Sequence, residues 1–375
     1  MTKKKVVIID SNIVNDYSLC LGQGIINNNS DVIIIVPENR LDNGFEDVKM
    51  LKWLPSKNRK VSKLYKIYAY LKYISKFIGL IFKYKPDAIH FEFFRFKSDF
   101  LLFPLLRLMK PKLVYTAHNI YPHERNKSDY FLHKIVYSAA EEIIVHSNFI
   151  KKRLIASFPV NEKKVKVIAH GNFDHYLPEH LSNKCDARKL LGISQNENVA
   201  LFFGYIREYK GVDLLLEAFK IIKEKNIKIK LLLAGAPYSD NLKREYLQMI
   251  EDYKLKDIIS YKLDFIKNEE IQNYFLAADL VVLPYKNIDH SGIVHLAFSF
   301  AKPIAASDVG DFSETIIDGR TGFIFKNNSP EDIAGTIFHA FENKQKLEEM
   351  GLQAKMDSDT LYSWKEIGKK TLELY

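Results

Sequence analysis

The chain has 375 residues, of which 47% are apolar, and its formal net charge is +9. This length exceeds what a single hydrophobic core usually organises, so we expect two domains. Lysines interrupt the longest apolar runs, which excludes a transmembrane helix. Cys20 and Cys185 show no metal or redox spacing, and no apolar signal segment follows Met1. We therefore expect a cytosolic protein with reduced thiols.

Short apolar runs alternate with helical patterns along the chain, which is typical of parallel sheets built from βαβ units. In the first half, the expected strands are 5–10, 32–36, 87–92, 113–118, 142–146 and 165–168. A polar, irregular break follows at about 172–183. In the second half, the expected strands are 199–203, 229–235, 258–261, 280–284, 303–306 and 322–325.

A basic segment lies between the second and third of these strands. Residues 57–85 contain nine Lys/Arg and no carboxylate, with aromatic and aliphatic residues interleaved at helical spacing. Such a helix suits an anionic membrane surface, because lysine stems can extend towards lipid headgroups. The alternative is a core-packing helix with a solvated basic face. No nucleic-acid motif accompanies the charge, so we expect no nucleic-acid binding.

Polar residues follow the expected strand 113–118. His118 ends the strand, and the loop after it contains Asn119, His123 and Glu124. A strand-end histidine can donate a hydrogen bond to a substrate or act as an acid or base, although it can also be a structural residue. Glu124 is the nearby candidate for a general base, or alternatively a carboxylate at a helix start. His90 and Glu92, on the strand 87–92, are expected to be packing and supporting groups.

The stretch 201–219, LFFGYIREYKGVDLLLEAF, is the most informative part of the second half. It predicts a buried strand, a turn at Gly204, and a helix that begins after Gly211. Arg207 and Lys210 lie between the two glycines, at the carboxyl end of the strand, where open α/β sheets bind ligands. A guanidinium and an ammonium there suit a diphosphate, although an ordinary surface pair is the alternative.

Four motifs in this order make the chain resemble the family 4 glycosyltransferases of the GT-B fold over essentially its whole length. They are FGYIREYKG, the pair HSNFIKKRL and VIAHGNFD, then FIKNEEIQNYFLAADLVVLPY, and finally KPIAASDVGDFSETIIDGRTGFIF. YTAHNIYPHE adds a similarity to the members with "HN-x-x-PHE" in the first domain.

The resemblance implies two Rossmann-like, doubly wound parallel-sheet domains facing a cleft. We place an acceptor-binding domain at 1–175 and a nucleotide-sugar-binding domain at 176–355. Residues 356–375 would form a helix that packs back on the first domain. The activity implied is sugar transfer from a nucleotide diphosphate sugar without a bound metal or other cofactor.

The resemblance also assigns roles to individual residues. Arg207 and Lys210, with Gly204, would bind the diphosphate and stabilise the leaving group. Phe265 and Ile266 would lie beside the nucleotide base. His118 and Glu124 are the catalytic candidates of the first domain. On the acceptor side the candidates are Asn119, His123 and the junction residue His170. Gly22 is a further candidate from the residues alone: we place it in the first βα turn, where a glycine lets a loop approach a ligand.

One departure from the family pattern concerns its E-x7-E pair. The two glutamate positions align with Ile288 and Leu296, which cannot hydrogen-bond a hydroxyl. The chain instead has Asp289 followed by His290 and by an "SG" loop variant. There the Ser291 hydroxyl and the N–H groups of Gly292 and Ile293 would hold a phosphate at a helix N-terminus. Asp289 would replace the absent sugar-binding carboxylate.

These observations predict a glycosyltransferase that moves a hexose-type sugar from a UDP- or GDP-sugar to a saccharide or polyprenyl-linked acceptor. We expect a retaining, metal-independent reaction in cell-surface polysaccharide synthesis. The protein would lie peripherally on the inner face of the cell membrane, through residues 57–85. The alternatives are a non-catalytic nucleotide- or glycan-binding protein, motivated by the absent E-x7-E pair, and a sugar-nucleotide epimerase of the same fold.

Overall fold

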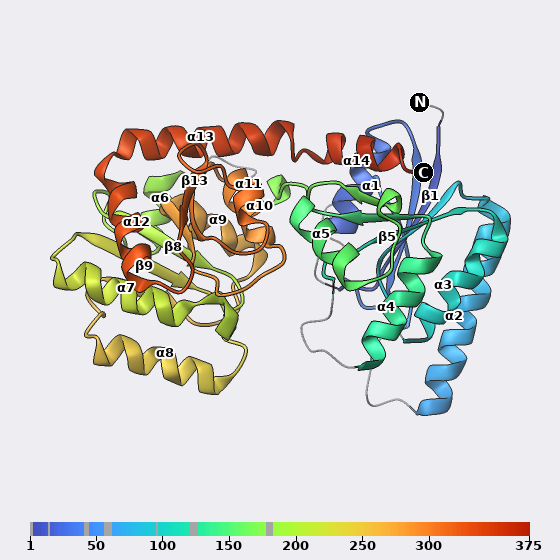
Figure 1. The fold of residues 1–375 in the computed structure, drawn as a ribbon, viewed down its shortest axis with the longest axis horizontal. Helices are drawn as coiled ribbons and strands as arrows, with labels where there is room; N and C mark the ends of the chain where they lie inside the picture. Colours follow the sequence, from blue (N-terminus) through green and yellow to red (C-terminus); the bar gives the residue numbers. More distant parts are fainter. Residues whose placement is uncertain are drawn as a thin grey trace. The chain divides into compact units, whose positions relative to one another are not determined.

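The computed structural model describes residues 3–13, 16–40, 45–55, 62–94, 97–120, 127–177 and 183–375. The chain forms two compact units (Figure 1). Unit 1 comprises Met1–Gly171 together with Tyr362–Tyr375, and unit 2 comprises Asn172–Leu361.

Unit 1 is built on a parallel sheet that has seven strands within the described residues, in the order β3-β2-β1-β4-β5-β6-β7. The strands are β1 (Lys5–Asp10), β2 (Asp31–Pro37), β3 (Lys49–Leu54), β4 (Ala88–Phe93), β5 (Lys112–Thr116), β6 (Glu142–Val145) and β7 (Val165–Val167). The strand order reverses between β1 and β4, so the carboxyl ends of these two strands flank a topological switch point.

Helices cover both faces of this sheet. They are α1 (Tyr17–Ile26), α2 (Lys63–Tyr84), α3 (Lys97–Leu106), α4 (Lys127–Ala139), α5 (Asn148–Ser157) and α14 (Trp364–Leu372). Alternate β1 residues enter opposite cores: Val7 packs with Phe77 of α2, whereas Ile8 packs with Leu21 of α1 and Ile367 of α14. This period of two explains why β1 is apolar at nearly every position.

Unit 2 has a second parallel sheet, with six strands in the described residues and the order β10-β9-β8-β11-β12-β13. The strands are β8 (Asn198–Phe203), β9 (Ile229–Ala234), β10 (Ile259–Lys262), β11 (Leu280–Leu283), β12 (Ile304–Ser307) and β13 (Gly322–Phe325). The helices are α6 (Lys184–Leu190), α7 (Val212–Glu224), α8 (Asp240–Asp252), α9 (Asn268–Ala277), α10 (Gly292–Ser299), α11 (Phe312–Thr315), α12 (Pro330–Glu342) and α13 (Lys344–Thr360). Its switch point lies between β8 and β11.

The expectation of two doubly wound parallel-sheet units, with a last helix that packs on the first, is confirmed. Two details differ from it. Strand β3 was not predicted: it is an edge strand whose residues are mostly half-buried or exposed and whose apolar run is broken by Lys52. Gly22 does not lie in a turn: it is buried within α1, where a Cβ would come within 2.9 Å of Ile34 Cδ1. It is a packing glycine.

Within the basic segment, residues 63–84 form α2, which begins after its N-cap Ser62, whereas residues 57–61 lie outside the described residues. Tyr73, Phe77 and Ile81 pack into the core of unit 1, as the core-packing alternative requires. The first half of the helix, however, exposes large apolar side chains: Leu64, Tyr65, Ile67, Tyr68 and Leu71. No helix in the described residues is both long enough and apolar enough to cross a membrane.

Candidate functional site

A tight turn at the carboxyl end of β8 forms the centre of the candidate site in unit 2. Gly204 and Gly211 both have positive φ, 109° and 68°, which favours glycine. At Gly211 a Cβ would also come within 1.9 Å of the Pro284 carbonyl oxygen, so no larger residue fits there. The two glycines thus bring Arg207 and Lys210 over the end of the sheet, next to the loop that follows β11.

Lys210 is half-buried, and its side chain has no ion pair with a carboxylate among the described residues. Its ammonium lies 5.2 Å from the centre of the Tyr285 ring. A Cβ added to Gly204 would lie 3.5 Å from Lys210 Nζ and 3.4 Å from Ile293 Cδ1, so the three residues meet. Burial lowers the pKa of Lys210 from 10.5 to about 8. A desolvated ammonium of this kind favours the arrival of an anion, which would stabilise its charge.

The N-terminus of α10 supplies further anion-binding groups at the same place. Ser291 is the N-cap residue and is almost fully buried, but its side chain makes no capping hydrogen bond to α10. Gly292 and Ile293 follow in the first turn, where helix N–H groups and the helix dipole favour negative charge. This helix end and the Lys210 ammonium thus place groups that can bind an anion close together.

Arg207 lies in the same turn as Lys210, with its guanidinium carbon 4.5 Å from the centre of the Tyr238 ring. Tyr205 and Phe265 lie nearby, with ring centroids 6.4 Å apart. Tyr205, Tyr238 and Phe265 follow β8, β9 and β10 and are 59%, 64% and 50% exposed, whereas Ile266 is buried. Tyr205 and Tyr238 were not among the site residues predicted from the sequence, although each is an aromatic residue placed shortly after a strand-end glycine.

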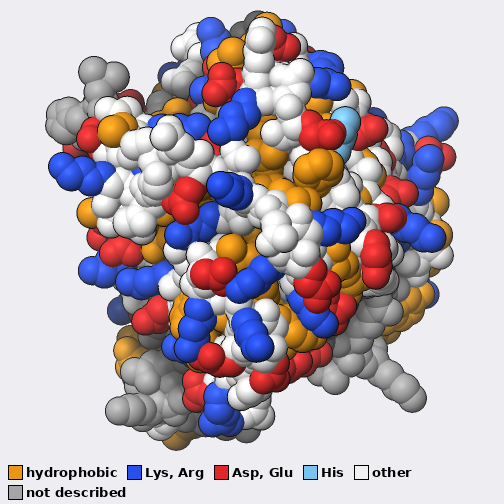
Figure 2. Space-filling model, turned by 90° about the vertical axis from the view of Figure 1, so that its left-hand side faces the viewer, with side chains coloured by type: hydrophobic (Ala, Val, Ile, Leu, Met, Phe, Trp, Pro, Cys, Tyr) orange, Lys and Arg blue, Asp and Glu red, His pale blue; other side chains and the backbone are white. Residues whose placement is uncertain are grey.

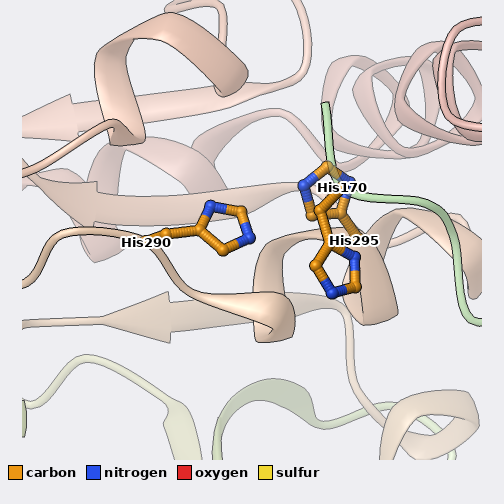
Figure 3. Close-up of side chains that lie close together, drawn as sticks. All are labelled: His170, His290 and His295. Carbon is orange, nitrogen blue, oxygen red and sulfur yellow. The ribbon is translucent and has the colours of Figure 1, made fainter. Parts of the chain in front are cut away.

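The loop before α10 contains a histidine–carboxylate pair that the sequence analysis also missed. His290 Nδ1 lies 2.7 Å from the Asp311 carboxylate, and its ring centroid is 5.6 Å from that of His295 on α10 (Figure 3). His170, also labelled in Figure 3, belongs to unit 1 and is described with that unit. Asp289 is half-buried in the same loop as His290. Asp311 could have been noticed in the sequence, because the chain has DVGD where the family motif has DVGG.

In unit 1, His118 lies two residues beyond β5, and both of its ring nitrogens are engaged. Nε2 is 2.7 Å from Glu92 Oε2, and Nδ1 is 3.1 Å from His146 Nε2. The His118 ring also stacks on Phe93, with centroids 4.5 Å apart, and meets the Tyr17 ring edge-on at 4.7 Å. Glu92 therefore contacts His118 directly, a contact that was not predicted from the sequence.

A cavity of about 200 Å³ lies beside this histidine at the carboxyl ends of β4 and β5. It combines polar groups with aromatic rings, and its lining includes Glu92, Phe93, Phe94, Tyr115, His118 and Asn119. His123 and Glu124, the other expected residues of this loop, lie outside the described residues. His170 is buried near Tyr17, and its Nδ1 is 2.6 Å from the Gly171 carbonyl oxygen.

Two family models match almost the whole chain. Residues 14–171 match the model described as Glycosyltransferase Family 4, and residues 183–357 match the model described as Glycosyl transferases group 1. The chain belongs to the family 4 glycosyltransferases, with the GT-B fold. It is therefore a transferase that uses a nucleotide sugar.

Curated relatives of this glycosyltransferase include an uncharacterized glycosyltransferase of Methanocaldococcus jannaschii, 27% identical over 75% of the chain and 73% of the relative. A second from that organism is 29% identical over 65% of the chain and 63% of its own length. A D-inositol 3-phosphate glycosyltransferase of Streptomyces avermitilis is 24% identical over 64% of the chain. The match spans only about half of that relative, 52%.

Solved structures share the fold at low sequence identity. Sucrose-phosphate synthase from Thermosynechococcus elongatus has a TM-score of 0.79 at 17% identity, with 100% of this chain and 98% of that chain covered. HepE of Anabaena, determined in complex with UDP and glucose, has a TM-score of 0.75 at 18% identity, with 99% and 98% covered. These likenesses concern the fold alone.

Proposed function

We propose that this glycosyltransferase moves a hexose-type sugar from a UDP- or GDP-sugar to a saccharide or polyprenyl-linked acceptor during synthesis of a cell-surface polysaccharide. The observation that carries the donor part is the buried ammonium of Lys210, placed beside Gly204 and the first turn of α10. A nucleoside diphosphate supplies the negative charge that this site lacks.

The chemistry follows from where charge develops. Breaking the bond between the sugar and the β-phosphate leaves negative charge on the diphosphate. Lys210, Arg207 and the N–H groups at the start of α10 would stabilise that charge without reorganising. From the family resemblance, the proposal also includes a reaction without a metal ion and with retention of the anomeric configuration.

The exposed aromatic residues near Arg207 support a nucleobase site. Tyr205, Tyr238 and Phe265 present rings at the ends of three neighbouring strands, and a planar base can stack on such rings. We assign the base to this cluster, with Phe265 and Ile266 as its nearest contacts. On the acceptor side we assign His118 and Asn119 to the saccharide, because the cavity beside them joins polar groups to aromatic rings.

The first half of α2 supports a peripheral membrane position on the inner face of the cell membrane. Leu64, Tyr65 and Leu71 are exposed next to the exposed lysines Lys66 and Lys72. Apolar side chains flanked by lysines suit an anionic lipid surface. By contrast, the face in Figure 2 mixes acidic and basic side chains, without a large area of one sign among its described residues. A lipid-linked acceptor would be presented at the membrane surface.

Calorimetry with UDP and GDP, followed by turnover of a panel of sugar nucleotides, tests the donor assignment. We expect one of the two nucleotides to bind and Arg207→Ala to weaken it about tenfold or more, because a charge-assisted contact is lost. Lys220→Met, at an exposed lysine on α7, is the control and should bind normally. Normal binding by the Arg207 variant would contradict the role of Arg207 in the phosphate site.

The alternatives have distinct outcomes in the same experiment. Nucleotide binding without turnover of any donor would favour a non-catalytic binding protein, which the apolar Ile288 and Leu296 positions motivate. Turnover that inverts a sugar centre without an acceptor would favour an epimerase. The likeness in fold extends to a Listeria monocytogenes protein named as a putative UDP-N-acetylglucosamine 2-epimerase, with a TM-score of 0.66 at 14% identity.

A further inference from the structure

A buried chain of hydrogen bonds runs through unit 1 beneath His118. Tyr375 Oη lies 2.5 Å from His90 Nδ1, and His90 Nε2 lies 2.7 Å from Thr116 Oγ1 and 3.2 Å from Glu92 Oε1. The other carboxylate oxygen, Glu92 Oε2, lies 2.7 Å from His118 Nε2. His90, Glu92 and Thr116 are at most 1% exposed, so solvent does not complete this network.

The hydrogen-bond directions can be followed from the far end. His146 Nδ1 lies 3.1 Å from the Ile168 carbonyl oxygen, which only accepts, so Nδ1 carries a proton. If His146 is neutral, its Nε2 accepts from His118 Nδ1–H at 3.1 Å. A neutral His118 would then present a lone pair to Glu92 at 2.7 Å. An ionised Glu92 would present another, and the two would repel.

One additional proton resolves this conflict wherever it resides. It can sit on Glu92, on His118, or on His146 with the His118 tautomer reversed, and in each case every contact has one donor and one acceptor. We infer that Glu92, His118 and His146 share one proton beyond a carboxylate and two neutral imidazoles, and that Glu92 is the positioning residue that holds the His118 ring.

The contacts of the other Glu92 carboxylate oxygen, Oε1, are consistent with this inference. Burial lowers the pKa of His90, which is therefore neutral. A neutral His90 accepts from the Tyr375 hydroxyl at Nδ1 and donates from Nε2 towards Thr116 and Glu92. The Thr116 hydroxyl donates to Glu92 Oε1 at 3.3 Å. Burial also raises the pKa of Glu92, which favours retention of the proton in the shared set.

Raising the pH should remove the shared proton and leave facing lone pairs, which would release the His118 ring. The elements packed around Glu92, His118 and His146 carry other titratable groups, whose charges affect how firmly the shared proton is held. They are Asp10 at the end of β1, Tyr17 on α1, His90 on β4, Tyr115 on β5, His133 on α4, His170 after β7, and Tyr375 after α14.

Nitrogen-15 NMR of the histidine-labelled full chain tests the shared proton without an assay of activity. In the wild type we expect the ring-nitrogen shifts of His118 to change in a pH titration, as the shared proton leaves the set of Glu92, His118 and His146. In Glu92→Gln, the amide N–H can donate to His118 Nε2, so the ring should stay neutral with its proton on Nδ1 throughout. Glu141→Gln is the control. Glu141 accepts a hydrogen bond from the Leu113 N–H at the opposite end of β5, so this variant should titrate like the wild type. An identical His118 titration in the wild type and Glu92→Gln would overturn the inference.

Thr116→Val is the second variant, in case Glu92→Gln fails to fold. It removes a hydroxyl that donates to the Glu92 carboxylate, so the carboxylate is less stabilised and the shared proton should leave at higher pH. An unmoved His118 titration in this variant would contradict the inference.

The catalytic part of the inference rests on the proposed function and is measured separately. With a saturating sugar nucleotide and water as the acceptor, Glu92→Gln should lower kcat about tenfold to a hundredfold, because a neutral amide holds the His118 ring less firmly than a carboxylate that shares a proton with it. The affinity for UDP or GDP should be unchanged. If the wild type binds neither UDP nor GDP, the proposed donor site is refuted, and the NMR result still stands. A normal kcat in Glu92→Gln would refute the positioning role of Glu92.

Discussion

The single most consequential side chain of unit 2 is Lys210. Its pKa is 10.5 when the lysine is solvated and about 8 in the fold, because burial disfavours the ammonium. Between these two values the unfolded chain binds more protons than the folded chain, so stability rises with pH across that window. Below pH 8 the fold carries the full electrostatic cost of a buried cation. Without a bound anion, the protein is therefore less stable than it would be with an apolar residue at position 210.

We predict that Lys210→Met stabilises the nucleotide-free protein and impairs binding. At pH 7 the free energy of unfolding should rise by on the order of 2 kcal/mol, because a buried charge is removed while the stem remains. The affinity for the UDP or GDP that the wild type binds should fall about tenfold or more. Urea denaturation and calorimetry measure the two effects.

Two other results would contradict this assignment. A destabilised Lys210→Met variant would indicate that the lysine has a native partner. Unchanged nucleotide affinity would place the diphosphate elsewhere. Lys220→Met should alter neither quantity.

At the scale of elements, α1 and α14 pack at backbone distance. A Cβ on Gly24 would lie 2.0 Å from the Trp364 carbonyl oxygen, and a Cβ on Gly368 would lie 2.4 Å from the Gly24 carbonyl carbon. Backbone atoms cannot give way as side chains do, so both positions require glycine. This contact attaches residues 362–375 to unit 1.

We predict that Gly24→Ala lowers the free energy of unfolding by about 1–3 kcal/mol, since the helices must separate. Gly79→Ala is the matched control: it also lies within a helix, α2, but a Cβ there meets nothing within 4 Å. It should be stabilising by about 0.5–1 kcal/mol through helix propensity. Thermal denaturation of both variants measures the difference, and equal melting temperatures would argue against the close packing.

The exposed half of α2 gives a second prediction at this scale. Replacement of Lys66 and Lys72 by Glu should lower co-sedimentation with vesicles containing anionic lipids about tenfold or more, because each lysine near such a surface contributes about 1 kcal/mol. The same reversal at Lys344 and Lys346, two exposed lysines of α13, is the control. Unchanged sedimentation of the α2 variant would refute the membrane surface.

At the scale of the whole molecule, the nucleotide groups we assign lie within one unit. The turn after β8 and the first turn of α10 come from segments more than eighty residues apart, yet they meet around Lys210. Binding energy from UDP or GDP is therefore expected to be local to unit 2.

Hydrogen–deuterium exchange tests this expectation. The bound nucleotide should slow exchange in peptides covering 204–211 and 291–296, because their N–H groups would contact phosphate or be shielded by it. Peptides from α8, which contributes no assigned contact, serve as the reference. Protection confined to unit 1 would contradict the donor site in unit 2.

Local patterns in the sequence determined the architecture and the outline of the donor site. The apolar runs identified every strand except β3, because a strand buried on both faces is apolar along its length, whereas an edge strand is not. Gly204, Arg207, Lys210 and Gly211 were assigned from one short segment, because glycine turns and phosphate-binding cations are encoded by neighbouring residues. The family resemblance supplied the order of the motifs.

Only the tertiary structure decided which distant groups meet. No local pattern predicted that Glu92 would contact His118, that His290 would pair with Asp311, or that Gly22 would pack inside a helix. These contacts join residues from different strands and loops, and their strength depends on burial, which raises the pKa of Glu92 and lowers that of Lys210. Spacing along the chain records periodicity and turns, but exclusion from water arises only when the elements pack.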